Sequence, residues 1–278
     1  MFRTQLGFSF LLCAILFVTT VPKPRLSGQE KSAKSGQETE QKKQDEKKGV
    51  PEGRTEYKGR RIARTMHYTG AEWLIRDVRE REERCSLLLA NLGLKKGMSI
   101  CDMGCGNGYH SLQMAKLIGD KGMVYGVDIQ SKMLEYLRER CEDQGVENVV
   151  PILGSFHNPR IPRDTFDLIL MVDVYHEFSH PEYMLKSMRD SLKKNGVIAL
   201  VEYRMEDEDV PIRLLHKMSK EQIMKEFPAN GFKLVKEYNK LPWQHLMFFA
   251  RDDSDLKEIK ASEWKPKSSD DSKTNDKR

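Results

Sequence analysis

The sequence predicts an α/β protein with a doubly wound, mostly parallel sheet of seven strands and helices on both faces. Apolar segments of strand length alternate with amphipathic helical segments between residues 98 and 251, as in parallel strands joined by crossover helices. The first strand runs into a turn that contains Gly104, Gly106 and Gly108. The second strand ends at an acid, Asp128, about 20 residues beyond that turn.

The predicted elements follow one another in a regular order. We expect strands at 98–103, 123–128, 149–154, 166–173, 197–203, 232–238 and 243–251, and helices at 109–118, 131–144 and 181–194. A further helix opens at a capping box in 219–222, and the last two strands form a terminal hairpin. Upstream, a helical pattern runs from Ala71 to a stop at Gly93, and its charged stretch 79–84 is predicted to be mostly solvated.

The glycine turn indicates a cradle for a nucleotide-type ligand. Glycines at this spacing let the backbone turn tightly and approach a ligand, and the helix that follows presents free N–H groups to it. A dinucleotide fingerprint would be Gly-x-Gly-x-x-Gly, whereas this turn is one residue shorter and the strand before it closes with Asp102. The spacing therefore disfavours a nicotinamide oxidoreductase.

These features together resemble motif I and the second-strand acid of the class I S-adenosylmethionine-dependent methyltransferases. The resemblance covers about Trp73 to Arg251. It implies the Rossmann-like methyltransferase fold with an antiparallel last strand, S-adenosyl-L-methionine as cofactor, and in-line methyl transfer to a small-molecule acceptor. An alternative is a binding module that keeps the cofactor site but has lost turnover.

The resemblance also implies which residues hold the cofactor. Asp102 and the backbone of the turn, Gly104, Cys105, Gly106 and Gly108, would hold the methionine moiety. Asp128 would accept hydrogen bonds from both ribose hydroxyls.

On the adenine side, Ile129 would pack against one face of the ring. Members of this family often carry an acid after the third strand that meets the adenine amino group. Here Ser155 occupies that place, and Phe156 would stack on the ring instead.

Three residues are candidates for the acceptor side. Asp173 closes the fourth strand and is expected to face the methionine end of the cofactor and the acceptor. His176 follows it, and an imidazole can act as a general base near neutral pH, so we treat that role as a hypothesis. Glu202 ends the fifth strand and is a second catalytic candidate.

The segment from His176 to His180 also matches the His-Glu-x-x-His pattern of zinc hydrolases, whose two histidines share one face of a helix. Pro181 follows directly, and residues before proline avoid the helical region. We therefore predict a strand-to-helix loop, with Pro181 as the first residue of the next helix, and no metal bound by His176 and His180.

Composition and the chain ends complete the prediction. The net charge is +5 with acids and bases interspersed, which argues against a nucleic-acid partner.

Residues 1–26 indicate a signal peptide or membrane anchor, with membrane association through 6–21. The enzyme would then be exported, or would face the cytoplasm if the segment is uncleaved. We expect a disordered linker at 27–60, the domain at 61–251 and a disordered charged tail at 252–278. No oligomeric state is indicated.

Overall fold

The computed structural model describes residue 49 and residues 51–265. The chain divides into two compact units, 1–51 and 52–278, and the described residues fall almost entirely in the second. The predicted signal or anchor segment and most of the predicted linker lie outside the described residues. Among the helices that are described, none is both long enough and apolar enough to cross a membrane.

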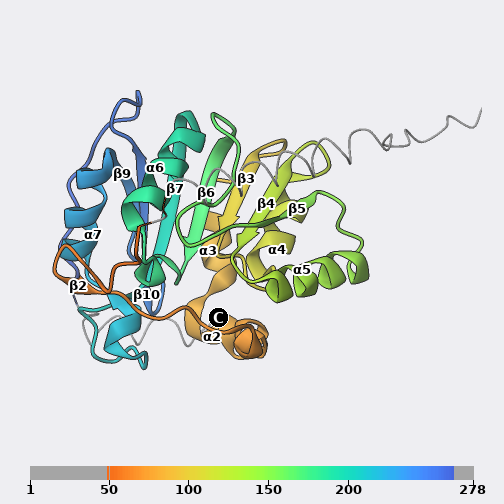
Figure 1. Ribbon diagram of the computed structural model, residues 1–278, viewed down its shortest axis with the longest axis horizontal. Helices are drawn as coiled ribbons and strands as arrows, with labels where there is room; N and C mark the ends of the chain where they lie inside the picture. The colour runs from red at the N-terminus through yellow and green to blue at the C-terminus, as the bar shows by residue number, and fades with distance from the viewer. Residues whose placement is uncertain (1–48, 50, 266–278) are drawn as a thin grey trace, which may run out of the picture. The chain divides into compact units, whose positions relative to one another are not determined.

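The centre of the domain is a mostly parallel sheet with the strand order β5-β4-β3-β6-β7-β10-β9 (Figure 1). Only β10 runs antiparallel to its neighbours, so the predicted doubly wound sheet with an antiparallel last strand is confirmed. A two-residue strand, β8, pairs with β7 as an eighth member that the sequence did not predict. The bounds are β3 Ser99–Met103, β4 Met123–Asp128, β5 Val149–Leu153, β6 Phe166–Val172, β7 Leu192–Arg204, β8 Lys217–Met218, β9 Phe232–Tyr238 and β10 Gln244–Arg251.

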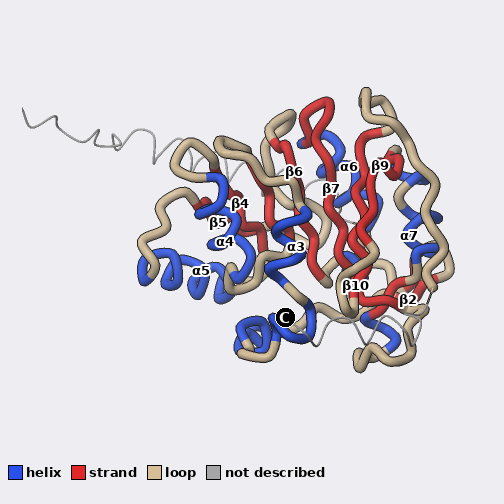
Figure 2. The backbone as a smooth tube through the Cα atoms, turned by 180° about the vertical axis from the view of Figure 1, so that it is seen from behind, coloured by secondary structure: helices blue, strands red, loops and turns tan. Residues whose placement is uncertain are grey.

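Helices cover both faces of this sheet, as Figures 1 and 2 show from opposite sides. Alternate residues of β3 point to opposite faces, since Cys101 and Met103 join one apolar core and Ile100 joins another. The first core contains side chains of α6 and α7, and the second contains side chains of α3 and α4. The helices are α3 Cys85–Asn91, α4 Tyr109–Ile118, α5 Ser131–Asp143, α6 Pro181–Ser191 and α7 Lys220–Glu226.

Two helix boundaries follow from local sequence signals, as predicted. The Ser219 side chain caps α7 by accepting a hydrogen bond from the Gln222 N–H at 3.1 Å. Pro181 is the first residue of α6, where a missing N–H costs no hydrogen bond. His180 stands at the N-cap position without a capping hydrogen bond from its side chain.

The segment before β3 differs from the continuous helix that its pattern predicts. It consists of a 3-10 segment η1 Tyr68–Ile75, a short helix α2 Arg79–Glu83, and α3. Arg84 separates the two α-helices with a left-handed backbone, φ 54°. Most of the stretch 79–84 is exposed or half-buried, as predicted, but Arg79 and Glu83 are buried, which the pattern did not predict.

The ordered domain is also longer than residues 61–251. Before it, β1 Glu56–Tyr57 and β2 Arg60–Arg61 form a small hairpin, and Arg60 makes an ion pair with Glu226 at 2.8 Å. After β10, the chain packs back on the sheet, where the N–H of Ile259 donates to the carbonyl of Leu234 at 2.8 Å. Residues 252–265 therefore belong to the folded unit, and 266–278 lie outside the described residues.

Candidate active site

A cavity of about 420 Å³ opens at the carboxyl ends of β3, β4, β6 and β7. This is the edge at which open α/β sheets bind ligands, and the volume lies within the roughly 300–1,000 Å³ of small-molecule sites. Much of the wall is apolar and comes from separate parts of the chain: Met66, Trp73, Leu74, Met133, Phe178 and Met184.

The glycine turn after β3 forms one wall of this cavity. Gly104 has φ 72°, and a Cβ built there would lie 2.4 Å from the Cγ2 atom of Val174. Gly106 has φ 54°, and its Cβ would lie 2.6 Å from a methyl group of Leu74. Glycine is therefore required at both positions by backbone conformation and by space, as the sequence predicts.

Asp128 lies at the end of β4 on the same wall. Its Oδ2 accepts the N–H of Gly106 at 3.0 Å, and its Oδ1 accepts the N–H of Gln130 at 2.9 Å. Burial raises the pKa of Asp128, and these backbone hydrogen bonds offset part of that effect. Each carboxylate oxygen keeps a further lone pair, so the side chain can still accept two hydroxyl groups.

Gln130 is a site residue that the sequence analysis missed. Its Nε2 donates to the carbonyl of Met66 at 2.9 Å, and its Oε1 accepts the N–H of Tyr68 at 2.8 Å. These two bonds fasten the segment before η1 beside Asp128, and Met66 and Gln130 both line the cavity.

The predicted adenine-side residues Ile129, Ser155 and Phe156 also line the cavity. The Ser155 hydroxyl accepts the N–H of Asn158 at 3.1 Å, so it shapes its own loop. The Phe156 side chain is 53% exposed, which leaves an aromatic ring free to pack against a bound ligand.

Three predicted cofactor residues are not part of the cavity wall: Asp102, Cys105 and Gly108. Asp102 is buried and accepts a hydrogen bond from the Ser111 hydroxyl at 2.5 Å. Burial, against the opposing effect of that bond, raises the pKa of Asp102 to about 6. Asp102 therefore holds the turn to α4, and any contact with a ligand ammonium group would have to be indirect.

Asp173 follows β6 with its side chain in the cavity wall. Its backbone is left-handed, φ 51°. Its Oδ2 accepts a hydrogen bond from Gln244 Nε2 at 2.7 Å, whereas the buried Oδ1 has no partner among the described residues. Burial and the carboxylates of Glu83 and Glu202 raise the pKa of Asp173 well above its usual range. A buried acceptor without a partner is expected to bind a ligand donor or water.

A buried charge cluster lies next to Asp173. Arg79 pairs with Glu83 at 2.8 Å, and Glu83 also accepts hydrogen bonds from Tyr203 and Arg76 at 2.9 and 2.6 Å. Burial opposes ionisation of Glu83, but Arg79 and Arg76 outweigh it and the pKa of Glu83 is lowered. Arg79 and Tyr203 line the cavity, so this cluster supplies a cation to one wall.

His176 and Glu202 meet at the other end of the cavity. The carboxylate of Glu202 accepts from His176 Nδ1 at 2.7 Å and from the His176 N–H at 3.2 Å. Burial disfavours the charged imidazole, but Glu202 outweighs burial and the pKa of His176 is raised. Glu202 is fully buried and is not part of the cavity wall, which corrects its prediction as an acceptor-side catalytic candidate: its carboxylate contacts His176 instead.

The structure confirms that residues 176–180 are a loop. Tyr175–Glu177 form a single 3-10 turn, η2, so His176 and His180 do not share a helical face. The residue opposite His176 is His216, on the 3-10 turn η3 Leu214–His216, with 3.1 Å between His176 Nε2 and His216 Nδ1. Glu177 lines the cavity beside them, and burial raises its pKa to about 7.

Comparison with known proteins identifies the family. A family model described as "Methyltransferase domain" matches residues 94–263, which is more than half of the chain. The chain belongs to this family. Its sheet order, glycine turn and strand-end acid place it among the class I S-adenosylmethionine-dependent methyltransferases, as the sequence predicts.

Curated relatives match parts of the chain. A ubiquinone/menaquinone biosynthesis C-methyltransferase UbiE from Azotobacter vinelandii is 29% identical over 161 residues, covering 55% of this chain and 62% of the relative. A probable cobalt-precorrin-6B C(15)-methyltransferase from Saccharolobus solfataricus is 39% identical over 76 residues, covering 27% of this chain and 38% of the relative. The matches thus span less than two thirds of these relatives' own lengths.

A solved structure supports the fold. A SAM-dependent methyltransferase from Aquifex aeolicus superposes with a TM-score of 0.63 at 23% identity, over 66% of this chain and 98% of that one. At this identity the similarity shows the fold alone.

The cavity of this methyltransferase fits S-adenosyl-L-methionine, the cofactor of the family. The backbone of Gly104 and Gly106 lines the cavity beside Asp128, and Asp128 has lone pairs for both ribose hydroxyls. The unpartnered Oδ1 of Asp173 and the neighbouring Arg79 offer an acceptor for an ammonium group and a cation for a carboxylate. The residues present thus offer hydrogen-bonding partners for the ribose hydroxyls and for the polar groups of the methionine end.

Proposed function

We propose that this methyltransferase transfers the methyl group of S-adenosyl-L-methionine to a small-molecule acceptor bound at the His176 end of the cavity. The observation that carries the proposal is one cavity lined by Asp128 and the glycine turn as well as by His176, Glu177 and His216. The apolar wall around the acceptor end, with Phe178, Met184 and Ile212, favours an acceptor with an apolar body.

Methyl transfer requires the protein mainly to position the acceptor and the cofactor. Bound S-adenosyl-L-methionine supplies an electrophilic methyl group on a sulfonium. The chain must hold the acceptor atom about 3–3.5 Å from that carbon and in line with the sulfur. Asp128, Asp173 and Arg79 would fix the cofactor from two sides, and the apolar wall would exclude water from the acceptor. His176, held by Glu202, is the proposed contact for the acceptor group that receives the methyl.

The general-base role of His176 stays a prediction. Its Nδ1 is occupied by Glu202, so only Nε2 could take a proton, and Nε2 already faces His216 at 3.1 Å. In the His176→Ala variant we expect turnover to fall at least 100-fold with a change in cofactor affinity below threefold, because the cofactor contacts lie at the other end of the cavity. Equal turnover in both proteins would remove His176 from the acceptor site.

One labelling experiment tests the acceptor class. The full chain is incubated with S-adenosyl-L-methionine that carries a heavy methyl label and with a cell extract split into small-molecule, protein and nucleic-acid fractions. We expect label in the small-molecule fraction together with S-adenosylhomocysteine. Label in the protein or nucleic-acid fraction alone would overturn the proposal. Cofactor binding without label in any fraction would favour the silent binding module.

Membrane association through residues 6–21 is also a proposal, and it is supported by the apolar run in that segment. A reporter that is active only outside the cytoplasm, fused after residue 50, tests its two forms. High activity would support export, and low activity with the protein in the membrane fraction would support a domain that faces the cytoplasm. Recovery of the full chain in the soluble cytoplasmic fraction would contradict both.

A further inference from the structure

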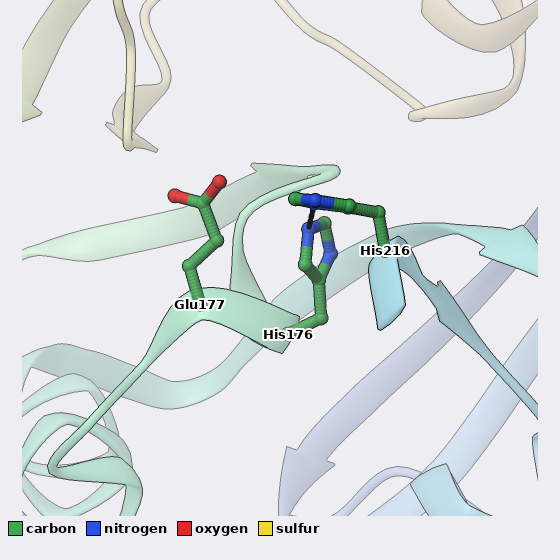
Figure 3. A group of neighbouring side chains, drawn as sticks. All are labelled: His176, Glu177 and His216. Atoms are coloured by element: carbon green, nitrogen blue, oxygen red, sulfur yellow. Dashed lines mark hydrogen bonds between the residues drawn. The ribbon is translucent and has the colours of Figure 1, made fainter. Parts of the chain in front are cut away.

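Three potential metal ligands converge at the acceptor end of the cavity: His176, Glu177 and His216. Their ligand atoms all lie within 4.8 Å of one another. Figure 3 shows the two imidazole rings nearly at right angles and joined by a hydrogen bond, with the Glu177 side chain rising on the same side of the ribbon. Two residues come from η2 and the third from η3, so distant segments of the chain, 40 residues apart, meet here.

The distance between the two histidines suits a shared ion. Two nitrogens bound to one ion at about 2.1 Å each can be at most about 4.2 Å apart. His176 Nε2 and His216 Nδ1 are 3.1 Å apart, well within that limit. A carboxylate oxygen of Glu177 lies within 4.8 Å of both ring nitrogens, and its Oε1 accepts the N–H of Met66 at 3.3 Å.

The hydrogen bond between Glu202 and His176 orients the imidazole for metal coordination. Glu202 is an obligate acceptor when ionised, so the His176 nitrogen that faces it at 2.7 Å carries the hydrogen. In the neutral ring this leaves the lone pair on Nε2, which points toward His216. A carboxylate that accepts from the far nitrogen of a metal-bound histidine is the usual outer partner of such sites, where it fixes the tautomer and the orientation of the ring.

We propose that His176, Glu177 and His216 bind a divalent transition-metal ion such as zinc, with its open coordination positions toward the cavity. Two imidazoles and one carboxylate form a set used by catalytic zinc and by non-haem ferrous sites, which leave positions free for water or substrate. In this methyltransferase such an ion would hold an oxygen or other donor atom of the acceptor, a consequence that rests on the proposed function. His176 would then act as a ligand rather than as a general base.

Metal binding can be measured without any acceptor. The full chain is stripped with a chelator, dialysed, and titrated with Zn²⁺ alone by calorimetry and with Co²⁺ alone by visible spectroscopy. We expect one equivalent per chain and Co²⁺ absorption bands of a nitrogen- and oxygen-ligated site. Failure of both ions to bind would overturn the proposal.

Variants separate this site from the His-Glu-x-x-His alternative. His216→Ala and His176→Ala should each weaken Zn²⁺ binding at least 100-fold, and Glu202→Gln by 10- to 100-fold. His180→Gln should leave it within threefold, because His180 is outside the cluster. Weaker Zn²⁺ binding by His180→Gln, or unchanged Zn²⁺ binding by His216→Ala, would contradict the assignment of the metal ligands.

Cofactor affinity, measured on the same variants, shows that each is folded and keeps the two proposals apart. If S-adenosyl-L-methionine binds and no metal does, the metal site fails and the methyltransferase proposal stands. His216→Gln serves as the second variant if His216→Ala does not fold.

Discussion

The side chain of Gln130 donates a hydrogen bond from Nε2 to the carbonyl of Met66 across 2.9 Å. Through this bond the strand-end loop that carries Asp128 holds the segment before η1 against the cavity. The segment has no regular structure between β2 and η1, so its position depends on individual hydrogen bonds such as this one and the bond from the Ala63 N–H to the His176 carbonyl at 3.1 Å.

Replacing Gln130 with Ala should release that segment. Two hydrogen bonds of about 1 kcal/mol each are lost, so we expect cofactor affinity to fall about tenfold. Hydrogen exchange should quicken at residues 66–68. Gln113→Ala is the control, since the Gln113 amide donates to the Tyr109 carbonyl within α4. Unchanged affinity and exchange in Gln130→Ala would show that the segment is held by other contacts.

Gly104→Ala tests the close approach in the turn. Alanine at a left-handed position costs about 1 kcal/mol, and here its Cβ would also meet Val174 at 2.4 Å. Gly145→Ala is the matched control, because Gly145 is also left-handed, φ 61°, with no atom within 4 Å of a Cβ.

Denaturant unfolding and cofactor calorimetry should then separate the two variants. Gly145→Ala is expected to lose about 1 kcal/mol of unfolding free energy and to keep its cofactor affinity. Gly104→Ala should lose more stability and at least tenfold in affinity. Equal behaviour of the two proteins would mean that space at Gly104 does not matter.

The strands and helices of the sheet could be predicted because their signals are local: apolar periodicity, Gly104 and Gly106 after β3, and Ser219 at the start of α7. The burial of Arg79 and Glu83 could not be predicted from such local signals. Their i, i+4 spacing is that of a solvated ion pair, and they are enclosed by residues distant in sequence, such as Tyr203, which lies 120 residues away from Glu83.

The candidate site shows the same limit. Asp128 and Asp173 could be predicted because acidic residues at strand ends are a recognisable sequence signal. Gln130 and His216 have no comparable local signal, because each depends on a contact with a residue distant in sequence. Glu202 was predicted as an acceptor-side group because the sequence places it at the correct edge of the sheet. The sequence does not show in which direction its carboxylate points.

Asp102→Asn should change how stability depends on pH. The pKa of Asp102 is about 6 in the folded protein against an ordinary value of 3.8, so between these values the folded state binds more protons than the unfolded state. The unfolding free energy of the wild type should therefore fall as pH rises from about 4 to about 6, by up to roughly 3 kcal/mol from this group.

The variant has no charge to desolvate and can still accept from the Ser111 hydroxyl, so it should lack this decline. The measurement is urea unfolding at a series of pH values for both proteins, and the difference between the two curves isolates Asp102. Parallel curves would contradict a raised pKa for Asp102.

The measurement that tests the central claim most directly is calorimetric titration of the full chain with S-adenosyl-L-methionine, for the wild type, Asp128→Ala and Asp120→Ala. Asp120 is exposed and lies outside the cavity wall, so it controls for the loss of one carboxylate. We predict one cofactor per chain in the wild type and in Asp120→Ala, and at least tenfold weaker binding in Asp128→Ala. No binding by the folded wild type, or equal affinity in all three proteins, would contradict the cofactor site described for this cavity.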